Sequence, residues 1–184
     1  MDGKYQNKYR IAPSRAQWWD YGRNGAYFIT ICTKDRHYFF GEIADEKMIL
    51  SPVGAIADVL WHQIPHHAPF VELGAFVVMP NHIHGILVLN KPPDDNGDND
   101  GDIPPPETPG QKRFRNQGAE TVSSIIGSYK SAVTRHANRL GLANGWQPRF
   151  DDRIIWDDEA YERVTQYIIN NPKNWGKDRF RKKK

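Results

Sequence analysis

The segment FVVMPNHIHGILVL, residues Phe76–Leu89, is almost wholly apolar, yet its centre carries Asn81, His82 and His84. The β-branched and aromatic residues on both sides of that centre favour buried β-strands. In a strand, side chains two residues apart point to the same face of the sheet. His82 and His84 are therefore predicted to project side by side from one face, while Ile83 packs into apolar surroundings on the other.

The sequence around this segment predicts an α+β fold. β-branched and aromatic runs predict strands, and apolar residues spaced three and four apart predict helices. The order contains more hairpin-like links than long parallel crossovers, which favours an antiparallel sheet with helices packed on it. The predicted strands cover 25–35, 37–50 (with a turn near Asp45), 71–80, 82–90 and a short stretch at 153–156, and the predicted helices cover 52–64, 119–141 and 157–171.

Local signals set the ends of these helices. Ser51 is the expected N-cap of the first helix, with Pro52 at its first position and Pro65 as its stop. Gly141 is the expected cap of the second helix. The buried face predicted for that second helix consists of Val122, Ile125, Ile126, Tyr129, Val133 and Leu140.

Length and composition favour one domain over residues 1–184 with a core of its own. Cys32 is the only cysteine, which excludes an intramolecular disulfide and a cysteine metal cluster. The N-terminus has no apolar signal region, and no apolar run approaches the ~20 residues that span a bilayer. We expect a cytoplasmic protein without a membrane partner.

The net charge of +3 is unevenly distributed. Segment 91–118 is rich in Pro, Gly and Asp, and we expect a mobile acidic insert there. Without it, the chain has 21 Lys and Arg (25 less four) against 16 Asp and Glu (22 less six). Residues 177–184 form a predicted basic tail that ends in RFRKKK. This distribution indicates either a polyanionic partner or ordinary solubilising charge.

Two imidazoles on one strand face make half of a divalent-metal site, or else they are two ordinary polar side chains of a sheet. Tyr167 and Asn171 lie four residues apart on the last predicted helix and would share a face. Asn171 could offer a third ligand oxygen, with the Tyr167 hydroxyl close to the metal. Alternatively, Tyr167 packs with Tyr161, Val164 and Ile168 while Asn171 ends the helix.

A tyrosine beside a His/His/amide metal site indicates phosphodiester chemistry. The phenolate would attack phosphorus, while the metal neutralises charge on the scissile phosphate. Two neutral imidazoles and a neutral amide leave the ion's charge uncompensated, which suits an anionic phosphate. Mg²⁺ or Mn²⁺ fits best, because the set has no thiolate and open positions could be filled by phosphate and water.

Three blocks of the chain resemble the HUH single-strand nucleases, and most closely the REP-associated tyrosine transposases. The blocks are YFITICTKDRHYFFG near the N-terminus, VVMPNHIHGILVL in the middle and WQPRFDDRIIWDDEAYERVTQYIINNPKNW near the C-terminus. The resemblance covers about residues 25–90 and 119–176. The acidic insert at 91–118 departs from the compact members of that family.

The resemblance implies a ferredoxin-like antiparallel sheet with helices packed on it. It implies nicking and rejoining of single-stranded DNA through a 5′-phosphotyrosine, acting on REP-like hairpins. By the same resemblance, Tyr167 is the expected nucleophile, and the expected metal ligands are His82, His84 and Asn171. The basic residues expected to contact DNA are Arg149, Arg179, Arg181, Lys182, Lys183 and Lys184.

Several other assignments compete with these. Tyr129 is a rival nucleophile, but Val133, one turn on, cannot bind a metal and Tyr129 falls on the predicted buried face. His62, His66 and His67 could bind Zn²⁺, although a helix end, where cationic histidine is favourable, explains them better. Arg149 could pair with Asp151 or Asp152 instead of phosphate. Trp146 could stack on a base or belong to the core.

Two other function classes stay open. A single-stranded nucleic-acid-binding module without cleavage would keep the sheet and the basic charge but form no covalent adduct. A small zinc hydrolase would need a carboxylate or a third histidine near His82 and His84, and none is evident. The sequence does not decide between monomer and homodimer, and it does not identify the hairpin, the guide sequence or the native metal.

Overall fold

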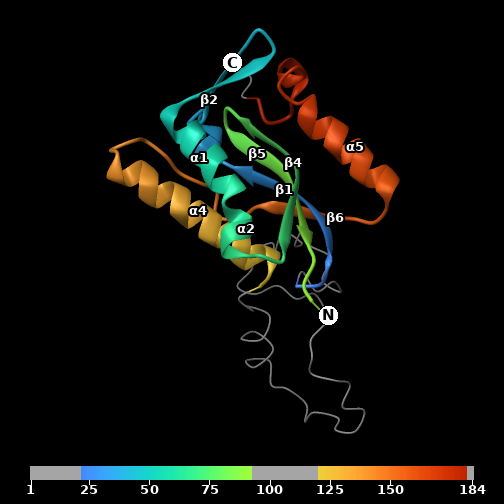
Figure 1. Cartoon of the computed structure of the whole chain (residues 1–184). Coiled ribbons are helices and arrows are strands. Elements are labelled where there is room, and N and C mark those ends of the chain that lie inside the picture. The colour runs from blue at the N-terminus through green and yellow to red at the C-terminus, as the bar shows by residue number, and fades with distance from the viewer. Residues whose placement is uncertain (1–21, 93–119, 182–184) are drawn as a thin grey trace, which may run out of the picture.

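The protein is described by a computed structural model that covers residues 22–92 and 120–181 (Figure 1). Most of the predicted insert at 91–118 lies outside these residues, as do Lys182, Lys183 and Lys184. The prediction of a mobile insert and that of a single domain therefore stay predictions.

The centre of the fold is a four-stranded antiparallel sheet with the spatial order β4-β5-β1-β6. Its strands are β1 (Gly25–Cys32), β4 (Val71–Met79), β5 (His82–Leu89) and β6 (Asp151–Ile155). Helices separate β1 from β4 and β5 from β6, and each pair encloses a third strand between its members. This double split βαβ arrangement is the ferredoxin-like topology, so the predicted fold class is confirmed.

The remaining elements lie around this sheet (Figure 1). A separate hairpin of β2 (Gly41–Ala44) and β3 (Lys47–Leu50) precedes α1 (Pro52–His62) and α2 (Ile64–His67). The later helices are α4 (Val122–Arg139) and α5 (Asp158–Ile169). Two short 3-10 turns cover Lys34–Arg36 and Trp175–Lys177. In Figure 1, α1 and α4 lie on one side of the sheet and α5 lies on the other.

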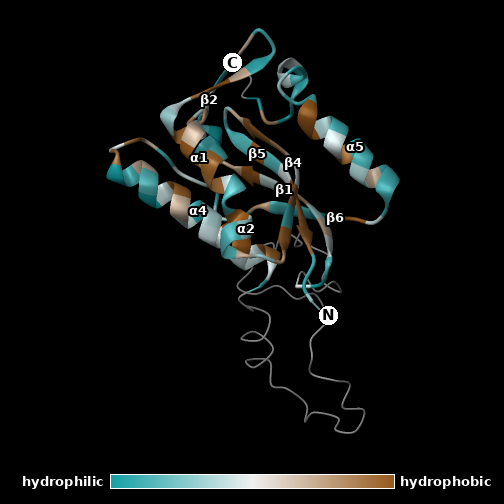
Figure 2. Ribbon diagram, viewed as in Figure 1, coloured by the Kyte–Doolittle hydropathy of each residue, from teal (hydrophilic) through white to brown (hydrophobic). Residues whose placement is uncertain are grey.

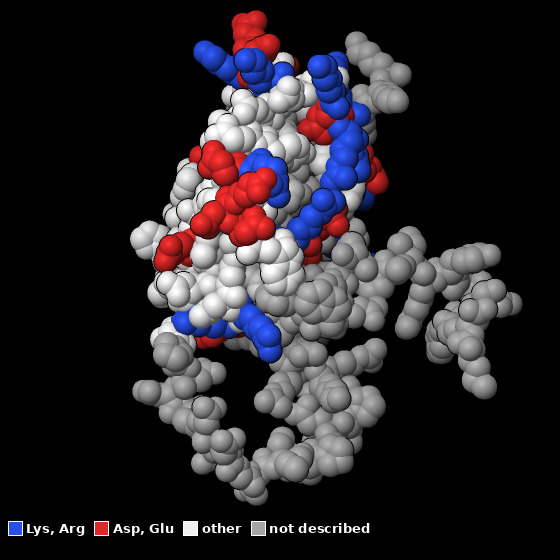
Figure 3. Space-filling model, turned by 90° about the vertical axis from the view of Figure 1, so that its right-hand side faces the viewer, with Lys and Arg blue, Asp and Glu red and all other residues white. Residues whose placement is uncertain are grey.

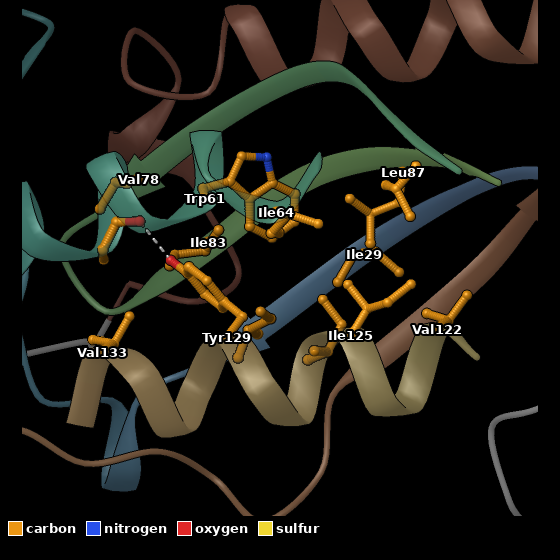
Figure 4. Packing of buried hydrophobic residues seen from close by; sticks show 14 of the residues in the cluster. Ile29, Trp61, Ile64, Val78, Ile83, Leu87, Val122, Ile125, Tyr129 and Val133 are labelled. Carbon is orange, nitrogen blue, oxygen red and sulfur yellow. Dashed lines mark hydrogen bonds between the residues drawn. The ribbon is translucent and has the colours of Figure 1, made fainter. Parts of the chain in front are cut away.

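The core fills the space between the sheet and the α1/α4 layer (Figure 4). Ile31 pairs with Ile83, and Tyr27 with Leu87, across β1 and β5, and all four side chains are buried on this face. Gly85 lies between them because the Trp61 ring occupies the space of a side chain. A Cβ at position 85 would lie 2.3 Å from Trp61 Cζ2. Figure 2 shows the resulting concentration of hydrophobic residues in the central strands.

The other face of the sheet carries the residues of opposite parity: Phe28, Thr30 and Cys32 on β1 and His82, His84 and Ile86 on β5. α5 covers this face and packs against β4 and β5. Strand alternation therefore separates an apolar core face from a face with buried polar groups. A candidate site lies where that second face meets the C-terminal end of α5.

The prediction of Ser51 as an N-cap is confirmed, whereas the predictions that Pro65 ends the first helix and that Leu140 is buried are wrong. The Ser51 hydroxyl accepts the Gly54 N–H at 3.0 Å, as an N-cap does. Pro65 does not stop α1, which already ends at His62. It opens α2 instead, because proline is tolerated in the first turn of a helix. Leu140 is 66% exposed, because α4 ends at Arg139 and the helical periodicity no longer applies.

The two short-strand predictions also have clear outcomes. The turn expected near Asp45 is confirmed, since Asp45 and Glu46 both have positive φ between β2 and β3, as the two central residues of a type I′ hairpin turn do. β6 begins two residues before the predicted strand and ends one residue earlier.

None of the helices within 22–92 and 120–181 combines the length and apolarity that crossing a bilayer requires.

Tyr129 allows a direct test of the core. Its hydroxyl donates a 2.8 Å hydrogen bond to the Ala57 carbonyl inside the α1/α4 interface (Figure 4). Tyr129→Phe should lower the free energy of unfolding by about 1–3 kcal/mol, because a buried acceptor loses its partner. Urea denaturation measures this. Tyr167→Phe is the comparison and should cost less than Tyr129→Phe, because its ring is partly exposed and its hydroxyl makes a long 3.3 Å contact with His84 Nε2.

Candidate functional site

Two imidazoles form the centre of the site. His82 and His84 project from the start of β5 toward the α5 side, as strand alternation predicts, and both are buried, with 0% and 1% of their surface exposed. Their ring centroids lie 4.5 Å apart. The hairpin between β4 and β5 brings the pair to the end of the sheet, close to the residues that follow α5.

The environment of His82 fixes its tautomer. Its Nδ1 lies 2.9 Å from Asn81 Oδ1, and an amide oxygen can only accept a hydrogen bond. The Asn81 amide is oriented by its Nδ2, which donates to the Phe180 carbonyl at 2.7 Å. The proton therefore belongs on Nδ1, and Nε2 keeps its lone pair. This Nε2 is buried and has no hydrogen-bond partner among the described residues.

His84 is held between β1 and α5. Its Nδ1 lies 2.9 Å from Thr30 Oγ1, and its Nε2 lies 3.3 Å from the Tyr167 hydroxyl. Burial, together with the positive charge of Arg179, lowers the pKa of His84 to about 3. Burial, followed by the neighbouring His84, lowers the pKa of His82 well below its usual range. Both rings are thus neutral at physiological pH, which is the form that binds metals.

Tyr167 lies in the last turns of α5 with 44% of its surface exposed. Its ring meets Phe28 edge-on, with 6.0 Å between centroids. Burial, and then the nearby Asp178 carboxylate, raise the pKa of Tyr167 above its ordinary value, while Asn171, Arg179 and Arg153 oppose the rise. The phenol is therefore protonated at neutral pH, and attack through its oxygen requires the proton to leave.

Asn171 lies just beyond α5, which ends at Ile169. The predicted helix to residue 171 is therefore slightly too long, because Pro172 disfavours helical geometry at the preceding residue. The side chain is 3% exposed and close enough to influence the pKa values of His82, Tyr167 and Asp178. Its Oδ1 is buried and makes no hydrogen bond within the described part of the chain.

The donor set fits a divalent cation. A buried acceptor without a donor costs free energy, and here two such atoms, His82 Nε2 and Asn171 Oδ1, belong to neighbouring side chains. A nitrogen lone pair and an amide oxygen are both metal ligands. Within 22–92 and 120–181, no group of three or more His, Cys, Asp or Glu side chains could hold a metal. Beside the two histidines, the Asn171 amide offers a buried oxygen without a hydrogen bond to any described residue, and the nearby Asp178 carboxylate oxygen lies 3.8 Å from His82 Nε2.

The other histidine cluster does not form a site. His62 lies in the last turn of α1, and His66 and His67 lie in the last turn of α2. All three are exposed. This placement agrees with the prediction of a helix end, where the macrodipole favours a cationic side chain.

Sequence reasoning missed Asp178 and Phe180, which lie in the predicted basic tail. Asp178 Oδ2 is 3.8 Å from His82 Nε2, and burial raises the pKa of Asp178. Phe180 is 4% exposed and lies over His82, with 4.5 Å between ring centroids. A single phenylalanine among five basic residues was the available signal, because a solubilising tail has no need of an aromatic side chain.

The predicted DNA-contacting residues have different surroundings. The guanidinium group of Arg179 lies 4.5 Å from the Phe180 ring centroid, and that of Arg36, which was not among the predicted contacts, lies 4.7 Å from it. Arg181 is exposed and donates to the Gly176 carbonyl at 3.4 Å. Arg149 is exposed, and the described residues give it no ion pair with Asp151 or Asp152. Figure 3 shows that the α5 face carries both a patch of acidic side chains and a row of basic ones.

Trp146 is half-buried. Its indole N–H lies 3.2 Å from the Lys130 carbonyl and 3.1 Å from Thr134 Oγ1, both on α4. The ring also packs near Phe40 and Tyr129. The structure therefore favours the core alternative for Trp146 over a ring free to stack on a base.

Comparisons with known proteins agree with this fold. No family model matches the chain. An uncharacterized protein of Haemophilus influenzae (strain ATCC 51907 / DSM 11121 / KW20 / Rd) is 32% identical over 168 residues, which are 90% of each chain. The solved structure of a REP-associated tyrosine transposase bound to a REP hairpin has a TM-score of 0.56 and 21% sequence identity, and the match covers 88% of this chain and 75% of that one. The sequence resemblance is thus supported at the level of the fold.

Asn81 is the residue through which the architecture of the site can be tested. Asn81→Ala removes the partner of His82 Nδ1 and the donor to the Phe180 carbonyl. We expect unfolding free energy to fall by about 1–3 kcal/mol. Trypsin should also cleave faster after Arg179 and Arg181, because the segment around Phe180 loses its anchor.

Asn90→Ala is the matched control, since Asn90 is exposed and its side chain makes one long hydrogen bond, to Glu72. It should change stability by less than about 0.5 kcal/mol. Equal trypsin sensitivity of Asn81→Ala and Asn90→Ala would show that Asn81 does not hold the C-terminal segment.

Proposed function

This chain belongs to the same family as the Haemophilus influenzae protein, and from its site we propose that it is a metal-dependent transposase that nicks and rejoins single-stranded DNA. The observation that carries the proposal is the Tyr167 hydroxyl 3.3 Å from His84 Nε2, beside two buried atoms without a hydrogen-bond partner among the described residues, His82 Nε2 and Asn171 Oδ1. A nucleophile next to a divalent-metal set is the arrangement that phosphodiester cleavage requires.

In the proposed reaction the Tyr167 oxygen attacks the scissile phosphorus. A bond from phosphorus to the phenol oxygen forms, and the bond from phosphorus to the 3′ oxygen breaks. The products are a 5′-phosphotyrosine and a free 3′-hydroxyl, which takes up a proton equivalent to the one that the phenol loses. Attack by a 3′-hydroxyl on the phosphotyrosine reverses the step and rejoins a strand.

His82, His84 and Asn171 would hold the ion, and a bound Mg²⁺ or Mn²⁺ would supply positive charge at the scissile phosphate. His84 Nε2 cannot hold the ion and the Tyr167 proton at once. In the loaded site, the Tyr167 hydroxyl would therefore be released from His84 and free to face the phosphate. Asn81 and Thr30 would keep the two imidazoles oriented through their Nδ1 atoms, as outer partners of metal-binding histidines do.

The substrate class follows from charge and from the related fold. The REP-associated transposase of similar fold is bound to a REP hairpin, and we propose REP-like hairpin DNA with a single-stranded flank for this chain. Arg149, Arg179, Arg181 and Lys182–Lys184 would contribute backbone contacts. Phe180 covers both imidazoles, so the segment from Asp178 to Phe180 has to shift before a phosphate can reach them.

A second candidate function is binding of single-stranded nucleic acid without cleavage. The coverage of the imidazoles by Phe180 and the raised pKa of Tyr167 favour it. The two candidates differ in one product, the covalent protein–DNA adduct, which a binding module never forms.

Tyr167→Phe tests the nucleophile. We expect it to abolish adduct formation while hairpin binding persists, because no other atom replaces the phenol oxygen. The assay uses a labelled hairpin with Mg²⁺ or Mn²⁺ and scores the adduct on a denaturing gel. Tyr129→Phe is the matched control and should retain adduct formation, because that hydroxyl is bonded within the core.

If Tyr167→Phe still forms the adduct and Tyr129→Phe does not, Tyr129 on α4 is the nucleophile instead of Tyr167. If the wild type forms no adduct with any hairpin tried, the second candidate function is favoured.

The metal ligands can be tested without cleavage. Mn²⁺ titration followed by electron paramagnetic resonance should show affinity lowered by about tenfold or more in His82→Ala, His84→Ala and Asn171→Ala, because each loses a donor atom. Tyr167→Phe should bind Mn²⁺ like the wild type. Unchanged affinity in Asn171→Ala would remove that amide from the ligand set.

A further inference from the structure

A second surface of the protein is a groove on the side of the sheet opposite α5. It has a volume of about 910 Å³ and lies between α4 and the segment that leads from α4 to β6. Its basic lining residues are Lys130, Arg135 and Arg139, and no Asp or Glu is among the described residues that line it. This differs from the α5 face, where acidic and basic side chains lie next to each other (Figure 3).

The floor of the groove is a stripe of small residues along α4. Ser123, Gly127 and Ser131 follow one another at four-residue spacing, so they share one face of the helix. A Cβ added at Gly127 would meet no atom within 4 Å, which shows that the space above the helix is open there. Trp146 and Phe150 form the wall across from this stripe.

Groups that could bind phosphate are available in the groove. Arg135 and Arg139 are exposed, and neither is engaged in an ion pair or hydrogen bond with another described residue. The hydroxyl of Ser131 adds a neutral donor beside them. Guanidinium groups with nearby hydroxyls are the usual partners of phosphate oxygens. Arg149, one of the expected DNA contacts, lies between two lining residues, Pro148 and Phe150.

The groove and the candidate site are joined by a short, well-bonded segment. Lys130 Nζ donates to the Gln147 carbonyl at 2.7 Å, and the Gln147 N–H donates to the Cys32 carbonyl at 2.9 Å. Cys32 lies directly opposite His82 in the sheet. A ligand in the groove would therefore be held in a fixed position relative to the imidazole pair.

From the open floor, the absence of acidic side chains among the described lining residues and the unengaged arginines, we infer that this groove binds the sugar–phosphate backbone of the DNA substrate, an inference that rests on the proposed function. It assigns the DNA-anchoring surface to α4 and the 146–150 segment, on the opposite side of the sheet from Tyr167. Arg135 and Arg139 contact phosphates, and Trp146 and Phe150 limit the width of the path.

The test places one charge in the groove without a change of shape. Gly127→Gln and Gly127→Glu are nearly isosteric, and both favour the helix more than glycine does. Binding of the full chain to a fluorescent DNA hairpin is measured by anisotropy, without metal and over a range of salt concentrations. Gly127→Glu should bind about tenfold or more weakly than Gly127→Gln at low salt, because its carboxylate faces the phosphates.

The plot of log affinity against log salt has a negative slope. Arg135→Gln should make this slope shallower by about 1, the value for one lost phosphate contact. Arg163→Gln is the matched control, because Arg163 is exposed on α5 and already paired with Glu159. It should leave the slope unchanged.

Equal affinities of Gly127→Glu, Gly127→Gln and the wild type would overturn the groove assignment. The adduct assay separates this result from a failure of the proposed function. If the wild type forms the adduct while Gly127→Glu binds normally, the groove assignment falls and the catalytic proposal stands. If Gly127→Glu loses binding while the wild type forms no adduct, the groove assignment stands alone.

Discussion

The site depends on the side chain and carbonyl of Asn81. Its carbonyl accepts hydrogen bonds from the Thr33 N–H at 2.9 Å and the Thr33 hydroxyl at 3.0 Å, which joins the β4–β5 turn to the end of β1. Its Oδ1 sets the tautomer of His82, and its Nδ2 holds the Phe180 carbonyl. One fully buried amide therefore orients an imidazole and anchors the segment that covers it. Asparagine suits this position because it offers a donor and an acceptor on a short side chain.

The part of the site that follows from local periodicity could be predicted from the sequence. The two-residue repeat of a strand places His82 and His84 on one face, whatever the rest of the fold is. The four-residue spacing also associated Tyr167 with Asn171, and they lie close together although α5 ends at Ile169, before Asn171. The first prediction depends on geometry within one strand and the second on local spacing near a helix end, and the structure places the four residues together. Their roles in metal binding and catalysis stay proposals.

The features that sequence reasoning missed depend on contacts between distant segments. Phe180 is buried because its ring packs against the imidazoles of His82 and His84, which lie almost a hundred positions earlier in the chain. No local sequence pattern encodes that contact. Pro65 and Leu140 show a smaller error of the same kind. Periodicity predicts which face of a helix is apolar, but the exact residue at which a helix ends also depends on its tertiary surroundings.

The low polarity around the two imidazoles explains how a strand in the middle of a sheet can carry reactive groups. Burial keeps His82 and His84 neutral, so their lone pairs are available without competition from protons. The same burial raises the pKa of Tyr167 and opposes formation of the phenolate. Desolvation therefore keeps both imidazoles neutral and Tyr167 protonated. In the proposed mechanism, a cation bound beside the phenol would supply the positive charge that favours loss of the Tyr167 proton, so the proposed cleavage would depend on a bound cation.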